Sequence, residues 1–203
     1  MEEDDDDVGN KVIFLGETSV GKTNLIKVST GQKFDPHSVI TWSASYVIRE
    51  FIYNNRKFIF DLWDTIGQEQ YRSLTKIFFK EAIIVILVYD ITNRRSFEEL
   101  EFWYGEVKNE VGDEFILAVV GNKIDLYTEE QVSEQEGKKY AAERGAKFKL
   151  TSAKEDPIGF VQFLEELFKD YIDKNSNQMM GKCRGISIKK KDLKNNKYTK
   201  KCC

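Results

Sequence analysis

The chain has 203 residues, a net charge of −3 and 41% hydrophobic residues, which is the size and composition of one folded domain. Its 13% aromatic content excludes wholesale disorder, and no run approaches the 18 consecutive apolar residues that a membrane-spanning helix needs. The acidic start at Glu2 excludes a signal peptide and also N-myristoylation, which requires glycine there. Because Cys183, Cys202 and Cys203 all lie near the C-terminus, we expect a reducing, cytoplasmic location.

Charge is unevenly distributed along the chain, and its distribution predicts three parts. Residues 1–10 carry six acids and no base, which predicts a disordered acidic leader. Residues 182–201 carry nine bases and one acid, so we expect 176–203 to be a flexible basic tail. Between them, residues 11–175 alternate short apolar runs with amphipathic stretches and predict a single folded domain.

Secondary structure in this domain can be predicted in chain order. Six apolar runs predict strands, at residues 11–15, 45–52, 57–63, 83–89, 115–121 and 147–150. Five amphipathic stretches predict helices, at residues 22–30, 71–80, 96–110, 130–144 and 159–174. Only Asn54 and Asn55 separate the second and third strands, so this pair must be an antiparallel hairpin. The pattern predicts an α/β fold, with a six-stranded, mostly parallel sheet, one antiparallel strand, and helices on both faces.

Residues 16–23 match the pattern G-x-x-x-x-G-K-T between the first strand and the first helix. The glycines let the chain curl, so that backbone N–H groups and the helix N-terminus can cradle phosphates. Lys22 is placed to reach β- and γ-phosphates, and the Thr23 hydroxyl to bind Mg²⁺. We therefore expect a nucleoside triphosphate at the residues Gly16, Glu17, Thr18, Ser19, Val20, Gly21, Lys22 and Thr23.

Two later loops indicate that the base is guanine. Asn122, Lys123 and Asp125 follow the fifth strand in the pattern N-K-x-D. The Asp125 carboxylate can accept two hydrogen bonds that guanine offers and adenine does not, while Asn122 ties the loop together and the Lys123 stem covers the ring. After the sixth strand, we expect Ser152, Ala153 and Lys154 beside the base, with a backbone N–H near Ala153 on the guanine carbonyl oxygen. Both loops lie at carboxyl ends of strands, where open α/β sheets bind ligands.

The segment after the third strand supplies groups suited to hydrolysis. Asp64 ends that strand and can hold Mg²⁺ through water. The Gly67 N–H can bond a γ-phosphate oxygen, and Gln68 is placed to orient an attacking water. Gln68 is therefore the expected catalytic residue.

With these motifs in this order, residues 11–175 and the C-terminus resemble a Rab-type small GTPase of the Ras superfamily. The resemblance implies GTP and GDP as ligands together with Mg²⁺. It implies that Thr41 contacts both Mg²⁺ and γ-phosphate, and that Phe34 packs against guanine, although a core role is the alternative for Phe34. It also implies an effector surface of Tyr46, Trp63 and Phe78, for which an aromatic core is the alternative. Trp42, directly beside Thr41, is an unusual aromatic that we expect to belong to the same surface.

Cys202 and Cys203 match the Rab signal for double prenylation, and two lipids with a basic tail would hold the chain on an anionic membrane. A nuclear-localisation or nucleic-acid patch is the alternative for the tail. The resemblance implies a monomer that binds no nucleic acid and cycles between the cytoplasm and the cytosolic face of an intracellular membrane in vesicle trafficking. Its implied partners are effectors, an exchange factor, a GTPase-activating protein, and prenyl-delivery and GDP-dissociation-inhibitor proteins.

Two residues depart from the family pattern close to the expected γ-phosphate. Ile66 stands where the family usually has alanine, and Thr18 where Ras has glycine. A misplacement of about 1 Å can cost on the order of a hundredfold in rate, so we expect slower intrinsic hydrolysis with nucleotide binding intact. A GTP-locked scaffold without hydrolysis is one alternative. A nucleotide kinase is another, which the N-K-x-D loop disfavours.

Overall fold

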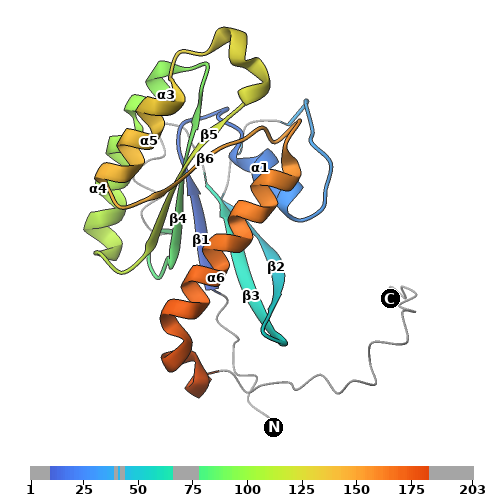
Figure 1. The fold of residues 1–203 in the computed structure, drawn as a ribbon, viewed down its shortest axis with the longest axis vertical. Coiled ribbons are helices and arrows are strands. Elements are labelled where there is room, and N and C mark those ends of the chain that lie inside the picture. Colours follow the sequence, from blue (N-terminus) through green and yellow to red (C-terminus); the bar gives the residue numbers. More distant parts are fainter. Residues whose placement is uncertain (1–9, 39–40, 42–43, 66–77, 183–203) are drawn as a thin grey trace.

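A computed structural model of the chain describes residues 10–38, 41, 44–65 and 78–182. Its six strands form one sheet in the order β2-β3-β1-β4-β5-β6 (Figure 1). The strands are β1 (Asn10–Leu15), β2 (Ser45–Tyr53), β3 (Arg56–Asp64), β4 (Ile84–Asp90), β5 (Ile116–Asn122) and β6 (Lys147–Leu150). Only the β2–β3 pair of this sheet is antiparallel, and the other neighbouring strands are parallel. The predicted mostly parallel sheet is confirmed.

The β2–β3 connection is the tight hairpin that the sequence predicts. Tyr53 pairs with Arg56, so Asn54 and Asn55 alone make the turn. Their φ angles are 50° and 59°, and asparagine is one of the few residues that tolerates this left-handed region. The turn therefore reverses the chain without a glycine.

Helices cover both faces of the sheet, as predicted (Figure 1). They are α1 (Lys22–Ser29), α3 (Arg94–Glu98), α4 (Leu100–Val111), the 3-10 helix η3 (Ile124–Glu129), α5 (Glu134–Glu143) and α6 (Pro157–Lys182). One apolar core joins α1 and α6 to the sheet, with Leu25 and Phe160 fully buried. The other joins α4 and α5 to the opposite face, with Trp103 and Ala141 buried. The cores fix the strand ends from which the loops of the site project.

Several predicted helix boundaries differ from those in the structure. The single helix expected at 96–110 is divided into α3 and α4 at Glu99, which keeps a right-handed helical conformation, so hydrophobic periodicity could not reveal the break. The helix expected at 130–144 begins later, because Ser133 and Glu136 form a reciprocal capping box that starts α5. Of the helix expected at 71–80, residues 71–77 lie outside the described residues.

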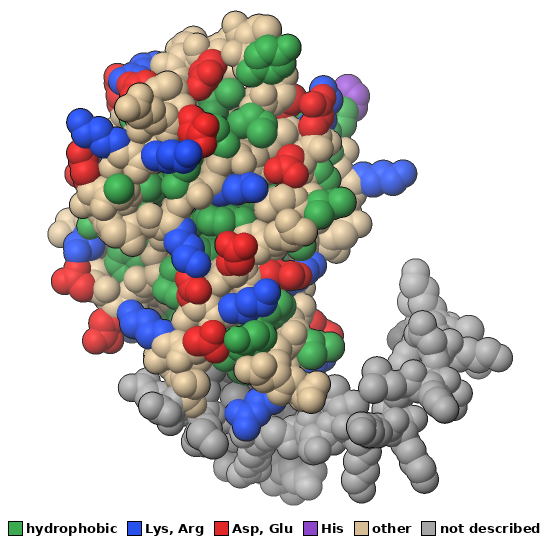
Figure 2. All heavy atoms as spheres, in the orientation of Figure 1, with side chains coloured by type: hydrophobic (Ala, Val, Ile, Leu, Met, Phe, Trp, Pro, Cys, Tyr) green, Lys and Arg blue, Asp and Glu red, His purple; other side chains and the backbone are tan. Residues whose placement is uncertain are grey.

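Helix α6 starts at Pro157, whose fixed φ suits a first helical turn, and the Asp156 carboxylate accepts the Gly159 N–H at 3.0 Å. It runs past the predicted end at residue 174 to Lys182, into the segment expected to be tail. Figure 2 shows acidic and basic side chains interspersed over this face of the molecule. Among the described residues, no helix combines the length and apolarity that crossing a membrane requires.

Candidate nucleotide-binding site

The loop between β1 and α1 depends on close backbone approach at both of its glycines. A Cβ on Gly16 would lie less than 3.0 Å from the Val88 carbonyl oxygen, and one on Gly21 equally close to the Asn122 amide nitrogen. Both glycines also have positive φ angles, of 143° and 100°. Side chains are therefore excluded at both positions, and the loop curls as a phosphate-binding loop requires.

Lys22 is the buried cation at the base of this loop, with a relative exposure of 6%. Its Nζ donates hydrogen bonds of 2.8 Å to the carbonyl oxygens of Gly16 and Glu17. Burial lowers the pKa of Lys22 to about 8, against the opposing effect of the Asp64 and Glu17 carboxylates. A buried ammonium held by neutral carbonyls is suited to an anionic ligand, because the ligand supplies the missing counter-charge.

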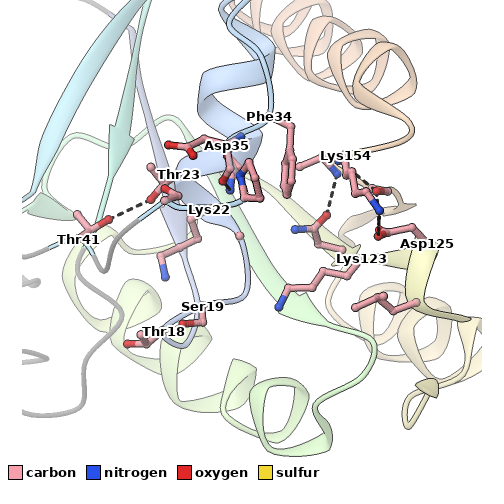
Figure 3. A pocket seen from close by; sticks show the side chains of 18 of the residues that line it. Thr18, Ser19, Lys22, Thr23, Phe34, Asp35, Thr41, Lys123, Asp125 and Lys154 are labelled. Atoms are coloured by element: carbon pink, nitrogen blue, oxygen red, sulfur yellow. Dashed lines mark hydrogen bonds and ion pairs between the residues drawn. The ribbon is translucent and has the colours of Figure 1, made fainter. Parts of the chain in front are cut away.

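Side-chain oxygens of Thr23, Thr41 and Asp64 lie close together at the amino end of α1, and Figure 3 shows the contact between Thr23 and Thr41. The Thr23 Oγ1 lies 2.7 Å from Asp64 Oδ2 and 3.0 Å from Thr41 Oγ1, and Thr41 Oγ1 lies 3.2 Å from the same carboxylate oxygen. Two hydroxyl oxygens and a carboxylate are the hard oxygen donors that Mg²⁺ prefers, so these residues fit such an ion, with Thr23 and Thr41 as its ligands and Asp64 holding it through water. Among the described residues, the buried Asp64 Oδ1 has no hydrogen-bond partner. Burial raises the pKa of Asp64, an effect that a nearby cation would oppose.

The loop after β5 is tied to the other loops by Asn122. Its Nδ2 donates to the Val20 carbonyl at 2.8 Å, and its Oδ1 accepts the Ala153 N–H at 3.2 Å. That N–H, expected near the guanine carbonyl, is therefore bonded to Asn122 in this structure. One side chain thus joins the phosphate loop, the N-K-x-D loop and the loop after β6.

Asp125 is held in place by groups from the loop after β6. The Ser152 hydroxyl donates to Asp125 Oδ1 at 2.6 Å, and Lys154 Nζ lies 3.8 Å from Oδ2 (Figure 3). The Ser152 Oγ also accepts the backbone N–H groups of Lys154 and Glu155. The carboxylate is only 9% exposed, so its acceptors have a fixed direction into the site.

Phe34 lies on a segment that α1 holds by a contact absent from the sequence-based prediction. The Asn24 amide makes two hydrogen bonds with the Asp35 backbone, donating to its carbonyl at 3.1 Å and accepting its N–H at 3.0 Å. Lys27 also pairs with the Asp35 carboxylate at 3.0 Å. The Phe34 ring packs partly against the α1–α6 core, which is the alternative considered for it, and also lines the site.

These segments surround one cavity of about 330 Å³. Thirteen of its lining residues were expected, namely Thr18, Ser19, Gly21, Lys22, Thr23, Phe34, Thr41, Asn122, Lys123, Asp125, Ser152, Ala153 and Lys154. Four other expected residues that the structure describes do not line this cavity, namely Gly16, Glu17, Val20 and Asp64. The lining residues that sequence analysis missed are Asn24, Asp35, Pro36, Ser38, Thr65 and Leu126.

The three described aromatics of the expected effector surface contact one another in series. Tyr46 and Trp63 are partners in the β2–β3 register, and their ring centroids lie 5.0 Å apart. Trp63 and Phe78 follow at 5.6 Å, and Tyr46 is 52% exposed. Five other expected residues lie outside the described part of the chain, namely Trp42, Gly67, Gln68, Cys202 and Cys203.

Comparison with known protein families assigns the chain to a class. Residues 11–174 match the Ras family model. The human Ras-related protein Rab-21 is 39% identical over 79% of this chain and 69% of its own length, and Rab-21 of the sponge Geodia cydonium is 38% identical over 81% and 72%. The GTP-binding protein ypt3 of Schizosaccharomyces pombe is 30% identical over 100% of this chain and 99% of its own length. The chain belongs to the Ras family and, within that superfamily, to the Rab-type small GTPases.

Proposed function

We propose that the protein is a GTP-dependent switch in vesicle trafficking, which hydrolyses GTP slowly and recruits effectors to an intracellular membrane. The observation that carries this proposal is the convergence of four loops on one cavity, with a buried cation at one end and an oriented carboxylate at the other. These are the groups that a triphosphate and a guanine base require. The Rab-type relatives support the trafficking role.

In the proposed complex, Lys22 binds the β- and γ-phosphates while Asp125 accepts the guanine N–H groups. Thr23 and Thr41 would bind Mg²⁺ directly and Asp64 would hold it through water, and the ion would supply positive charge beside the phosphates. Gln68 orients the attacking water and the Gly67 N–H donates to the γ-phosphate. Intrinsic turnover of the order of 10⁻⁴ s⁻¹ is expected from such a site, which an activator's arginine raises about 10⁵-fold.

Nucleotide binding and hydrolysis test this proposal directly. The purified protein should bind GTP and GDP with Mg²⁺, reject ATP in competition, and release phosphate in a single turnover. Tight ATP binding would favour the nucleotide kinase instead, and bound GTP that is never hydrolysed would favour the locked scaffold.

The role of Ile66 calls for a separate comparison, because it directly precedes Gly67 and Gln68 in the sequence. We expect Ile66→Ala to hydrolyse bound GTP faster than wild type in a single-turnover assay, with unchanged GDP affinity. Equal rates would remove Ile66 as the cause of slow hydrolysis.

Membrane attachment is proposed to depend on prenylation of Cys202 and Cys203, reinforced by the basic residues before them. Under this proposal the protein is a monomer whose partners are effectors, an exchange factor, an activator, and prenyl-delivery and GDP-dissociation-inhibitor proteins. Replacing both cysteines by serine should move the protein from the membrane to the soluble fraction of cells. Retention on membranes would contradict lipid anchoring.

A further inference from the structure

We propose that Asp90 is a positioning residue for guanine-nucleotide retention, acting by fixing the side chain of Lys123; this inference rests on the proposed function. Asp90 ends β4 and stands in register with Asn122 at the end of β5. Its Oδ2 forms an ion pair of 2.6 Å with Lys123 Nζ. Asp90 does not line the cavity, whereas Lys123 does.

The two carboxylate oxygens of Asp90 bind different partners. Oδ1 accepts hydrogen bonds from the Thr92 backbone N–H at 2.9 Å and from its hydroxyl at 2.8 Å. This anchor fixes the carboxylate and leaves Oδ2 directed at Lys123. The side chain is only 8% exposed, so water screens the pair weakly.

The backbone of Lys123 is fixed independently of its side chain. Its φ of 69° lies in the left-handed region, which a non-glycine residue adopts only where neighbouring contacts hold it. Its carbonyl accepts the Leu126 N–H at 2.9 Å, and the next residue, Ile124, donates to Thr151. These bonds fix the backbone, and Asp90 fixes the far end of the side chain. The stem between them is thereby held at the cavity wall.

This arrangement assigns Lys123 a mainly apolar contact with the ligand. Because its ammonium already has a carboxylate partner, its four-carbon stem is the part left to cover a purine face. Figure 3 shows Lys123 and Phe34 entering the same cavity from different segments of the chain. Losing Asp90 would free the stem to leave the ring, so the nucleotide should dissociate faster.

The test is the dissociation rate of fluorescently labelled GDP, in excess Mg²⁺ and unlabelled GDP, from four proteins: wild type, Asp90→Asn, Lys123→Met and the double variant. Asp90→Asn keeps an oxygen for Thr92 but replaces the ion-pairing oxygen by an amide. Dissociation should accelerate about tenfold, the kinetic equivalent of one charged hydrogen bond. Lys123→Met keeps an apolar stem without the charge. The double variant should therefore release GDP within about twofold of Lys123→Met alone.

If Asp90 only supported the fold, Asp90→Asn would accelerate GDP dissociation by the same factor in the Lys123→Met protein as in wild type. That outcome, or an Asp90→Asn rate within twofold of wild type, would overturn the inference. Glu136→Gln is the matched control, since it breaks an ion pair with Arg94 and should leave the rate unchanged. If Asp90→Asn does not fold, Thr92→Val can replace it in the same comparison of single and double variants. This substitution removes the hydroxyl that donates to Asp90 Oδ1 and so leaves the carboxylate less firmly held.

Failure of this inference differs from failure of the proposed function. If wild type does not retain GDP at all, the proposed function itself is wrong. If wild type retains GDP and Asp90→Asn retains it equally well, only the role of Asp90 is wrong.

Discussion

We propose that base selection in this site depends on the two oxygens of a single carboxylate. Asp125 is 9% exposed and receives the Ser152 hydroxyl at 2.6 Å, so its direction is set before any ligand arrives. A buried acceptor of this kind discriminates strongly, because a base without matching donors leaves it unpaired. The identity of this side chain, more than the shape of the cavity, should therefore decide which nucleotide binds.

Asp125→Asn should weaken GTP binding by about a hundredfold or more and strengthen binding of xanthosine triphosphate. An amide offers an N–H donor where guanine also has a donor, but xanthine has a carbonyl at that position. Competition titrations with both nucleotides would measure the change. Asp170→Asn, which breaks an ion pair with Lys147 elsewhere, serves as the control. Unchanged selectivity in Asp125→Asn would contradict the assignment.

Asn24→Ala should accelerate GDP dissociation about tenfold, since two hydrogen bonds that hold Asp35, and with it the neighbouring Phe34, on α1 are lost. Stopped-flow release of labelled GDP measures this rate. Lys27→Ala removes only a partly exposed ion pair with Asp35 and should change the rate less than twofold. Equal effects of the two substitutions would argue that the Asn24 contacts are unimportant.

At the scale of elements, α5 packs closely on the sheet because of one glycine in its interior. A Cβ on Gly137 would lie less than 3.0 Å from both the Tyr89 hydroxyl and the Phe148 ring. Glycine in a helix interior costs about 1 kcal/mol relative to alanine, so its presence here indicates a packing requirement. Gly105 in α4 differs, since a Cβ added there would have no neighbouring atom within 4 Å among the described residues.

Gly137→Ala should therefore lower the free energy of unfolding by about 1–3 kcal/mol through overpacking. Gly105→Ala is the matched control and should raise it by about 0.5–1 kcal/mol through helix propensity. Urea unfolding of GDP-bound protein would measure both values. A stabilising Gly137→Ala would show that α5 does not pack as described.

The start of α5 should be sensitive to acid through Glu136. Hydrogen bonds from Arg94 and from Ser133 lower the pKa of this carboxyl to about 2. Its contribution to stability is therefore full above about pH 5, near its unfolded pKa, and disappears as the pH falls towards 2. Glu136→Gln should unfold at a lower temperature than wild type at pH 7, and the difference should shrink below pH 5. A gap that is constant with pH would contradict this role.

Sequence patterns predicted the strands better than the helix ends, for a physical reason. Six apolar runs and the turn at Asn54 and Asn55 were sufficient to predict every strand of the described sheet. The helix boundaries depend instead on local details. The Ser133 side chain caps the start of α5 by hydrogen bonds, and Glu99 keeps a helical conformation at the break between α3 and α4. Hydrophobic periodicity contains no information about such contacts.

At the scale of the whole molecule, the site is formed by loops that the parallel sheet brings to one edge. Motif spacing could predict which loops meet, because the carboxyl ends of parallel strands share an edge. It could not predict the Asn24 contacts with Asp35 or the pairing of Asp90 with Lys123. These contacts depend on where the side chains point in the folded protein, and motif spacing contains no information about that. Residues of that kind are recognised only when the fold is known.

The proposed switch also implies that the γ-phosphate and Mg²⁺ order two segments, residues 34–46 and 66–78, and that hydrolysis releases them. Amide hydrogen exchange, measured by mass spectrometry on the protein loaded with GDP or with a non-hydrolysable GTP analogue, tests it most directly. We expect slower exchange in both segments in the triphosphate form, with little change elsewhere. Identical exchange in the two forms would contradict it.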